Sequence, residues 1–442
     1  MVSPTLAFED IQGTVLRRRP ERYCGRYILY RVTNGAGARR MVERILPHVT
    51  SAANWDAPKP YTVNLVFTWQ GFKALGIPDR ILNSFPEEFR AGMAARAEIL
   101  GDTGESAPEH WVRPLGSNDV HIGVVISAGS EADLAEPIRI AMSAYEGIPG
   151  VEPIYRIDVG VPSTGREHFG FRDGIGSVSI IGSEVEPLPG QDPVMPGEFI
   201  LGYPDETGSV APMPQPEVLG KNGAFLAFRQ MYCDVGAFRR YLQANARDKD
   251  DEELLAAKMV GRWRSGAPLS LSPEKDDPAL GADPLRNNDF RYYEDDPRGL
   301  KCPLGSHIRR CNPRDGLTGS IVNVNRHRLI RRGSAYGPEL PADQVQDDGV
   351  DRGIVFIFMG ASLIRQFEFI QQAWINNGDF VGLGEEVDPL VGPNNGHGTH
   401  TIPARPIRRR LTGLPRFVTV RGGEYCFLPS ISALQWLSRG QY

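Results

Sequence analysis

The sequence predicts an α+β protein built from two ferredoxin-like halves, each a split β-α-β unit with an antiparallel sheet and helices packed on it. Strand-like and helix-like segments alternate in the order β-α-β-β-α-β, and this order starts again in the second half of the chain. A stretch rich in proline and glycine, from 187 to 220, separates the two runs. We therefore expect domains over 1–186 and 221–442, joined by a linker over 187–220.

The segments of the first half follow one another closely. Its strand-like segments are rich in β-branched and aromatic residues, and its helix-like segments carry apolar residues at helical spacing. In chain order these segments are 26–34, 41–49, 61–69, 119–128, 131–145 and 153–160. This order is that of a split β-α-β fold.

The second half begins with residues 223–235, which have the pattern of a strand feeding a helix from near Ala237. Residues 353–361 form a nearly continuous apolar strand, typical of a strand that is covered on both faces. We expect residues 424–430 to close the second sheet. The helix after 353–361 carries apolar residues on one face, namely Leu363, Phe367, Ile370 and Trp374.

The composition argues against several classes of protein. The 442 residues carry a net charge of −5, which is unlike a nucleic-acid-binding protein, and no apolar run approaches the length of a membrane span. Residues 1–20 contain no apolar core of a signal peptide. The five cysteines form no CxxC pair, so neither a zinc site nor a disulfide framework is indicated. We therefore expect a cytoplasmic protein that binds neither nucleic acid nor membrane.

One segment, EHFGFRDGIG at 167–176, places a single acidic side chain, Asp173, between Gly170 and Gly174. Glycine permits backbone conformations and close approaches that other residues do not. The segment lies just before the linker, where the two halves meet, and pockets often form at such seams. Asp173 is therefore a candidate for a carboxylate that transfers protons.

A second segment, KCPLGSHIRRCNPRDG at 301–316, contains His307 among arginines. A single histidine is commonly a surface or satisfied core residue, but imidazole is also the commonest protein ligand of haem iron. Asp388, in EEVDPLVGPNN, likewise has two interpretations. It either starts a turn or accepts a hydrogen bond from a metal-ligating histidine.

A third segment, NRHRLIRRGSAYG at 325–337, is strongly basic. It is either a solvated face or, given its apolar pair Leu329 and Ile330 and the glycine that follows, a segment that carries one arginine inward. Other motifs are weak: His397 and His400 lack further metal ligands, and neither a nucleotide-binding glycine motif nor a serine hydrolase elbow is present.

Together these segments resemble the dye-decolourising peroxidases, a family of haem b peroxidases. GFRDG (170–174) fits the family's G-x-x-D-G signature, GSHIRRCNPR (305–314) its proximal-histidine segment and LIRRGSAYG (329–337) its distal-arginine segment. DIQGTVL (10–16) is similar to its N-terminal stretch, and RGIVFIFMGAS (352–362) to its distal-pocket strand. The five segments occur in the family's order, and the length is similar to that of the larger bacterial and fungal members.

The resemblance implies non-covalent haem b, held by His307 as axial ligand between the sheet and the helices of the C-terminal half. It implies that Asp173 is the distal acid–base, that Arg331 is the distal cation and that Asp388 supports His307. Arg331 is preferred over Arg332 because it occupies the family's arginine position, counted back from AYG. Further cofactor contacts are implied for Gly174, Ile175, Gly176, Arg310, His327, Phe356 and Phe358.

The sequence differs from the family pattern at the position two residues after the implied distal arginine, Arg331. Many compact relatives have an asparagine there, whereas this chain has Gly333. Any contribution of a side-chain amide to peroxide cleavage is therefore not expected in this chain.

The activity implied by the resemblance is reduction of hydrogen peroxide through a high-valent iron intermediate, with oxidation of dyes, phenols or similar one-electron donors. We expect an acidic optimum, because an ordinary aspartate is ionised from about pH 4. Two alternatives stay open: a non-enzymatic carrier of haem or porphyrin, and a haem-dependent oxygenase or hydrolase acting on a specific metabolite.

Either a monomer or a dimer is compatible with the sequence. Four aromatic residues could relay electrons to the surface or simply pack in the core: Tyr336, Trp374, Tyr425 and Trp436.

Overall fold

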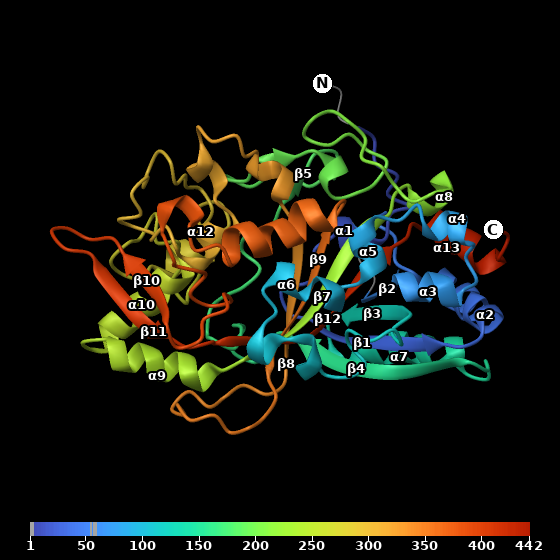
Figure 1. The fold of residues 1–442 in the computed structure, drawn as a ribbon, viewed down its shortest axis with the longest axis horizontal. Helices are drawn as coiled ribbons and strands as arrows, with labels where there is room; N and C mark the ends of the chain where they lie inside the picture. The colour runs from blue at the N-terminus through green and yellow to red at the C-terminus, as the bar shows by residue number, and fades with distance from the viewer. Residues whose placement is uncertain (1–3, 54, 56–59) are drawn as a thin grey trace.

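The strands of the two halves form one closed barrel in the computed structural model, which describes residues 4–53, 55 and 60–442 (Figure 1). The strand order is β1-β3-β2-β12-β7-β9-β8-β4, and neighbouring strands are antiparallel. The barrel strands are β1 (Cys24–Val32), β2 (Tyr61–Phe67), β3 (Ile122–Ala128), β4 (Val151–Gly160), β7 (Ala224–Cys233), β8 (Ile330–Tyr336), β9 (Gly353–Gly360) and β12 (Val418–Leu428). The α+β class with antiparallel sheets is therefore confirmed.

Each half contributes four strands in the same relative order. The first half is arranged as β4-β1-β3-β2 and the second as β8-β9-β7-β12. The two sheets join where Phe67 pairs with Phe427 and where Gly160 pairs with Ala335. The predicted halves are thus recognisable, but they share one barrel rather than forming two separate sheets.

The strand β8 was not among the predicted strands. Its sequence, IRRGSAY, places two arginines and a glycine where a strand usually carries β-branched residues. The structure explains this composition, because alternate residues of a strand face opposite sides of the sheet. Arg331 and Gly333 face outward from the barrel, whereas Arg332 points inward and donates to the carbonyl oxygens of Thr14 and Arg17.

Helices cover the outer face of each sheet. On the first sheet lie α2 (Gly35–Ile45) and α7 (Glu131–Tyr145), whose N-termini are capped by Asn34 and Ser130. On the second sheet lies a π-helical segment in two parts, η8 (Leu363–Glu368) and η9 (Ile370–Ile375). The predicted apolar face of this segment is confirmed as buried, with Leu363, Phe367, Ile370 and Trp374 each 7% exposed or less.

A third group of elements lies at the far end of the barrel from α2 and α7 (Figure 1). It comprises α9 (Val235–Asn245), which Asp234 caps and which begins two residues before the predicted start, together with α10 (Lys249–Val260) and the hairpin β10–β11 (Gly398–Ile402 and Arg409–Leu414). These elements share one apolar cluster. The remaining helices are α1 (Gly13–Leu16), α3 (Trp69–Ala74), α4 (Asp79–Leu82), α5 (Glu87–Ala91), α6 (Ala97–Leu100), α8 (Glu217–Gly220), α11 (Pro278–Ala282), α12 (His307–Cys311) and α13 (Ile431–Arg439).

The predicted linker over 187–220 is packed against the barrel. Its strand β6 (Pro193–Val194) pairs with β5 (Ser179–Ile180), and Val194, Phe199 and Ile200 are fully buried in the cluster that fills the barrel. The proposed boundaries at 186 and 221 stay a prediction, and residues 1–3 of the first domain lie outside the described residues. Among the described residues, no helix combines the length and apolarity needed to cross a bilayer.

One acidic side chain, Glu424, faces the barrel interior. It lies directly opposite Phe228 across the β7–β12 ladder, is 6% exposed, and accepts a hydrogen bond from the Gly116 N–H at 2.7 Å. Burial raises the pKa of Glu424 to about 8, and the single backbone donor only partly offsets this. The carboxyl is therefore mostly protonated at neutral pH.

We expect Glu424→Gln to make the stability less dependent on pH. An unfolded glutamate titrates near pH 4.3, so folded Glu424 binds the extra proton, and its contribution to stability is lost as the pH rises toward about 8. Between pH 5 and pH 9 the free energy of unfolding should fall less in E424Q than in the wild type, by on the order of a few kcal/mol. Urea unfolding at several pH values measures this, with the exposed Glu9→Gln as control; parallel curves for E424Q and wild type would contradict the expectation.

Candidate active site

Asp173 lies on a tight turn whose shape is fixed by a neighbouring carboxylate. Glu167 accepts hydrogen bonds from the N–H groups of Phe169 and Phe171, both at 2.9 Å. Burial raises the pKa of Glu167 to about 7, although these two donors oppose the rise. Gly174 has a φ of +76°, a conformation that favours glycine, and its N–H donates to Asp173 Oδ1 at 2.6 Å. The Asp173 side chain is therefore held at an exposed position by local backbone contacts.

Arg331 lies on the same outer sheet face to which Asp173 is directed. Its Nη2 donates to the Gly176 carbonyl oxygen at 2.9 Å, which links β8 to the Asp173 segment. Asp173 Oδ2 lies 3.1 Å from the place where a Cβ of Gly333 would be, and Gly333 is on the same face as Arg331. The predicted pairing of Asp173 with Arg331, rather than with Arg332, therefore agrees with the geometry.

Two stacked phenylalanines flank this pair. Phe356 and Phe358 lie on β9 with ring centroids 5.0 Å apart, and they pair across the ladder with Gly333 and Arg331 respectively. The Phe356 ring lies 2.8 Å from the position that a Gly333 Cβ would occupy. The glycine at 333 thus makes room for Phe356, which explains why this chain has no larger side chain there.

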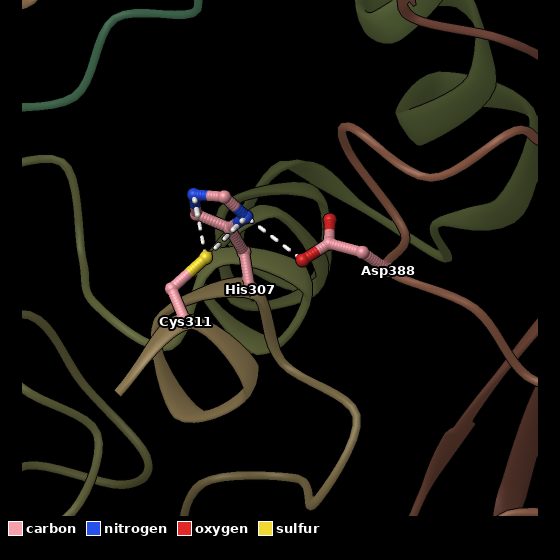
Figure 2. Close-up of side chains that lie close together, drawn as sticks. All are labelled: His307, Cys311 and Asp388. Carbon is pink, nitrogen blue, oxygen red and sulfur yellow. Dashed lines mark hydrogen bonds and ion pairs between the residues drawn. The ribbon is translucent and has the colours of Figure 1, made fainter. Parts of the chain in front are cut away.

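His307 is held by a buried carboxylate, as Figure 2 shows. Its Nδ1 lies 2.9 Å from Asp388 Oδ2, and the other oxygen, Oδ1, accepts from the N–H groups of Leu390 and Val391 at 2.9 and 3.0 Å. Burial alone would lower the pKa of His307, but the Asp388 charge outweighs burial and raises it well above its usual value. Because Nδ1 is engaged by Asp388, Nε2 is the nitrogen left to bind a metal.

Sequence reasoning missed one neighbour of His307. Cys311 lies one helical turn further along α12, and its Sγ is 3.7 Å from Nδ1 and 3.8 Å from Nε2 of His307 (Figure 2). Ligand atoms of His307, Cys311 and Asp388 all lie within 4.8 Å of one another. The His-x-x-x-Cys spacing, which places both side chains on one helix face, was the available signal.

Arg310 is buried and joins α12 to two other parts of the chain. It is 0% exposed, and its guanidinium donates to the carbonyl oxygens of Trp374 (2.7 Å), Asn377 (3.2 Å) and Glu386. It also lies over the Phe380 ring, with 5.1 Å to the centroid. Both terminal nitrogens of Arg310 thus donate to backbone carbonyls, so the guanidinium ties α12 to η9 and the Asp388 loop, and contact of Arg310 with the cofactor stays a prediction.

Two further predicted cofactor contacts, His327 and the segment 174–176, make hydrogen bonds to other parts of the protein. His327 Nδ1 donates to the Arg365 carbonyl oxygen at 2.6 Å, and the ring stacks on Phe369 with centroids 3.8 Å apart. Ile175 receives a hydrogen bond on its carbonyl oxygen from Asn288 Nδ2 at 2.8 Å. Contact of His327 and of the segment 174–176 with a cofactor stays a prediction.

A polar cavity lies where the Asp173 segment, the chain after α12 and the start of β8 meet. Gly176, Asn312, Arg314 and Arg328 contribute to its lining, with Gln191. Among the described residues, Asn312 Oδ1 and Gln191 Nε2 are buried without a hydrogen-bond partner, and the Arg328 guanidinium makes no hydrogen bond. Burial lowers the pKa of Arg328 to about 9, and nearby Arg331 and Arg314 add to this. In the described part of the chain the cavity therefore has unused donors from Gln191 and Arg328, an unused acceptor from Asn312 and positive charge suited to an anionic group, with the Asp192 carboxylate also in its lining.

Comparisons with known proteins agree with this site. Residues 10–146 match the family model described as the DyP dimeric alpha+beta barrel domain. A dye-decolorizing peroxidase of Mycena epipterygia is 34% identical over 89% of this chain and 80% of its own length. Two solved structures each cover 98% of this chain and 100% of theirs, with a TM-score of 0.85 and 31% identity: a dye-decolorizing peroxidase in complex with 2,6-dimethoxyphenol, and one whose heme pocket was engineered for asymmetric sulfoxidation.

The barrel, the His–Asp pair and the acid–guanidinium pair are thus found in a chain that matches peroxidases over nearly its whole length. The site is that of a peroxidase enzyme. The chain belongs to the dye-decolorizing peroxidase family, with its fungal members among its relatives.

We expect Gly333→Ala to slow the reaction with hydrogen peroxide. The new Cβ would lie 2.8 Å from the Phe356 ring and 3.1 Å from Asp173 Oδ2, so one of these groups must move. A shift of about 1 Å at a reacting group can lower a rate on the order of 100-fold. Stopped-flow absorbance of the haem-loaded enzyme measures the rate, and adding Phe356→Ala should restore part of it; an unchanged rate in G333A would contradict this account of the site.

Proposed function

We propose that this peroxidase binds haem b non-covalently through His307 Nε2, uses Asp173 and Arg331 to cleave hydrogen peroxide, and oxidises dyes, phenols or similar one-electron donors at acidic pH. The observation that carries the proposal is the His307–Asp388 pair. It holds one imidazole nitrogen and leaves the other for iron, while a separate acid and guanidinium share one sheet face.

The residues present fit a porphyrin. Gly174 and Gly176 bring backbone rather than side chains to the Asp173 segment, and a flat ring needs such close approach. Carboxylates of haem would find the Arg328 guanidinium, which has no hydrogen-bond partner among the described residues, at the polar cavity described above. We therefore propose that the cofactor lies between the second sheet and its helices, with Arg328 as an anchor that sequence reasoning did not identify.

Haem, when bound, supplies the iron at which peroxide is reduced. Asp173 takes the proton from one peroxide oxygen and returns it to the other, so that water leaves. Arg331 stabilises the negative charge that develops as the O–O bond breaks. Both roles require an ionised carboxylate and a cation on one side of the site, which agrees with the sheet face that they share.

The donor class follows from the family and from the pocket. A solved relative binds 2,6-dimethoxyphenol, which supports phenols as donors here. The stacked Phe356 and Phe358 restrict the distal side, so bulky dyes are expected to give up electrons from the surface rather than at the iron. A haem carrier would need His307 and the cavity but neither Asp173 nor Arg331, and for this reason we favour the peroxidase over a carrier.

We also propose the cytoplasm as the location of the enzyme. The five cysteines are all free, and three of them are buried. Free thiols are typical of a reducing compartment.

We expect Asp173→Asn to keep the haem spectrum and to lower the rate of reaction with peroxide on the order of 100-fold or more, because the amide cannot accept the proton. Stopped-flow absorbance and steady-state turnover with a phenol measure this, with the exposed Asp289→Asn as control. His307→Ala should change the absorption spectrum or lose haem. A D173N enzyme as fast as wild type would remove Asp173 from the mechanism, and an unchanged spectrum in H307A would remove the ligand assignment.

We expect Arg328→Leu to weaken haem binding. A lost charge-assisted hydrogen bond is worth about 1.5–3 kcal/mol, which corresponds to roughly a 10- to 100-fold higher dissociation constant. Transfer of haem to an excess of apomyoglobin measures the affinity, with the exposed Arg166→Leu as control. Equal transfer rates for R328L and R166L would exclude Arg328 as an anchor.

A further inference from the structure

We propose that Tyr425 is a redox-active residue, which gives an electron to the peroxide-oxidised cofactor, passes its phenolic proton to Glu368 and persists as a neutral tyrosyl radical. The proposal rests on the peroxidase function above and adds to it a second site, one where an oxidising equivalent is stored within the protein.

The register of the barrel places Tyr425 on the sheet face that carries the distal pair. Arg331 on β8 pairs with Phe358 on β9, which pairs with Ala227 on β7, which pairs with Tyr425 on β12. Directly opposite residues in neighbouring strands face the same side. Three strand spacings separate Arg331 from Tyr425, about 14 Å between backbones.

Aromatic rings fill the space above this row. Phe358 stacks on Phe356 in the distal pocket, Phe367 of η8 lies against Phe358 with centroids 5.2 Å apart, and Tyr425 meets Phe367 edge-on at 6.1 Å. Phe358 is partly buried, and Phe367 and Tyr425 are 3% and 1% exposed. The distal pocket is therefore connected to Tyr425 by successive ring contacts, of which the last two rings are buried, and electrons cross such packed matter more readily than gaps.

The phenol has a dedicated proton acceptor. Tyr425 Oη donates to Glu368 Oε1 at 2.9 Å, and Glu368, which is 1% exposed, is held by the Arg96 guanidinium at 2.9 and 2.6 Å. Removal of an electron makes a phenol a strong acid, so its proton moves along the existing hydrogen bond to the carboxylate. This step leaves a neutral radical, whereas an oxidised phenylalanine or an unpaired tyrosine in the same core would retain a buried charge.

The step is balanced. One electron leaves Tyr425 and reduces the cofactor by one equivalent, the Oη–H bond breaks, and an O–H bond forms on Glu368. The oxidant is the peroxide that the established activity consumes. Reduction by an external donor reverses both movements, and the proton returns from Glu368 to the phenolate oxygen.

The setting of the group favours a long-lived radical. Tyr425 is 1% exposed and thus shielded from solvent. Of the groups in its hydrogen-bonded chain, only the Arg96 side chain, which is 20% exposed, reaches the surface. Tyr336, another candidate from the sequence, faces the barrel interior, and its hydroxyl donates to Asp351 at 3.1 Å. Tyr336 therefore offers a matched control: a tyrosine with a carboxylate partner, but on the opposite side of the sheet.

The test is electron paramagnetic resonance of the haem-loaded enzyme, frozen after peroxide is added without a donor. We expect a tyrosyl signal in wild type and in Tyr336→Phe and its loss in Tyr425→Phe. Tyrosine deuterated on the ring should narrow the wild-type signal. The haem absorption change on adding peroxide should proceed at the wild-type rate in Y425F, because Tyr425 does not act in peroxide cleavage.

A second measurement addresses the proton. In Glu368→Gln the radical should form on the order of 100-fold more slowly, because the amide cannot take the proton. If E368Q does not fold, slower radical formation by wild type in D₂O replaces it. An undiminished tyrosyl signal in Y425F, or its loss in Y336F alone, overturns the proposal while the haem absorption change remains normal. Failure of the proposed function is distinguished by a wild type whose haem absorption does not respond to peroxide.

Discussion

The alternation of side chains across the closed barrel is the constraint on which the site depends. Each strand presents one set of residues to the barrel interior and the other to the helices outside. On β8 this rule separates two adjacent arginines: Arg332 donates to backbone carbonyls inside, and Arg331 faces outward beside Asp173. A slip of one residue in the β8–β9 register would exchange them and remove the distal cation. The register of strand pairing therefore decides which arginine lies beside Asp173.

On the opposite side of the site, the position of His307 depends on the buried carboxylate of Asp388. Asp388 is fully buried, and two backbone N–H groups as well as His307 satisfy its carboxylate. A buried carboxylate without such partners would be costly, so the loop after Asp388 and the α12 histidine stabilise each other. Arg310 adds to this arrangement from behind, since it binds carbonyls of both the helical segment and the loop. The imidazole is thus oriented by the fold.

The sequence was sufficient where a signal is local or periodic. The alternating segments predicted an α+β fold with antiparallel sheets, and a carboxylate partner for a ligating histidine predicted the contact of Asp388 with His307. It was insufficient where the outcome depends on tertiary packing. β8 lacks strand composition because its outer face lines the site. The Arg310 guanidinium is held by carbonyls of the distant residues Trp374 and Glu386, a contact that no local pattern indicates. The closure of two sheets into one barrel, set by the pairs Phe67–Phe427 and Gly160–Ala335, has no local signal.

Barrel closure also bears on how the chain is made. During synthesis the first sheet emerges with β2 and β4 at its edges, and their barrel partners, β12 and β8, follow more than 150 residues later. Until residues 418–428 leave the ribosome, the nascent chain carries an open edge that could pair with another copy. A chaperone that shields this edge, or slow translation near the end of the message, would therefore influence the yield of active enzyme more than either would for two independently closed domains.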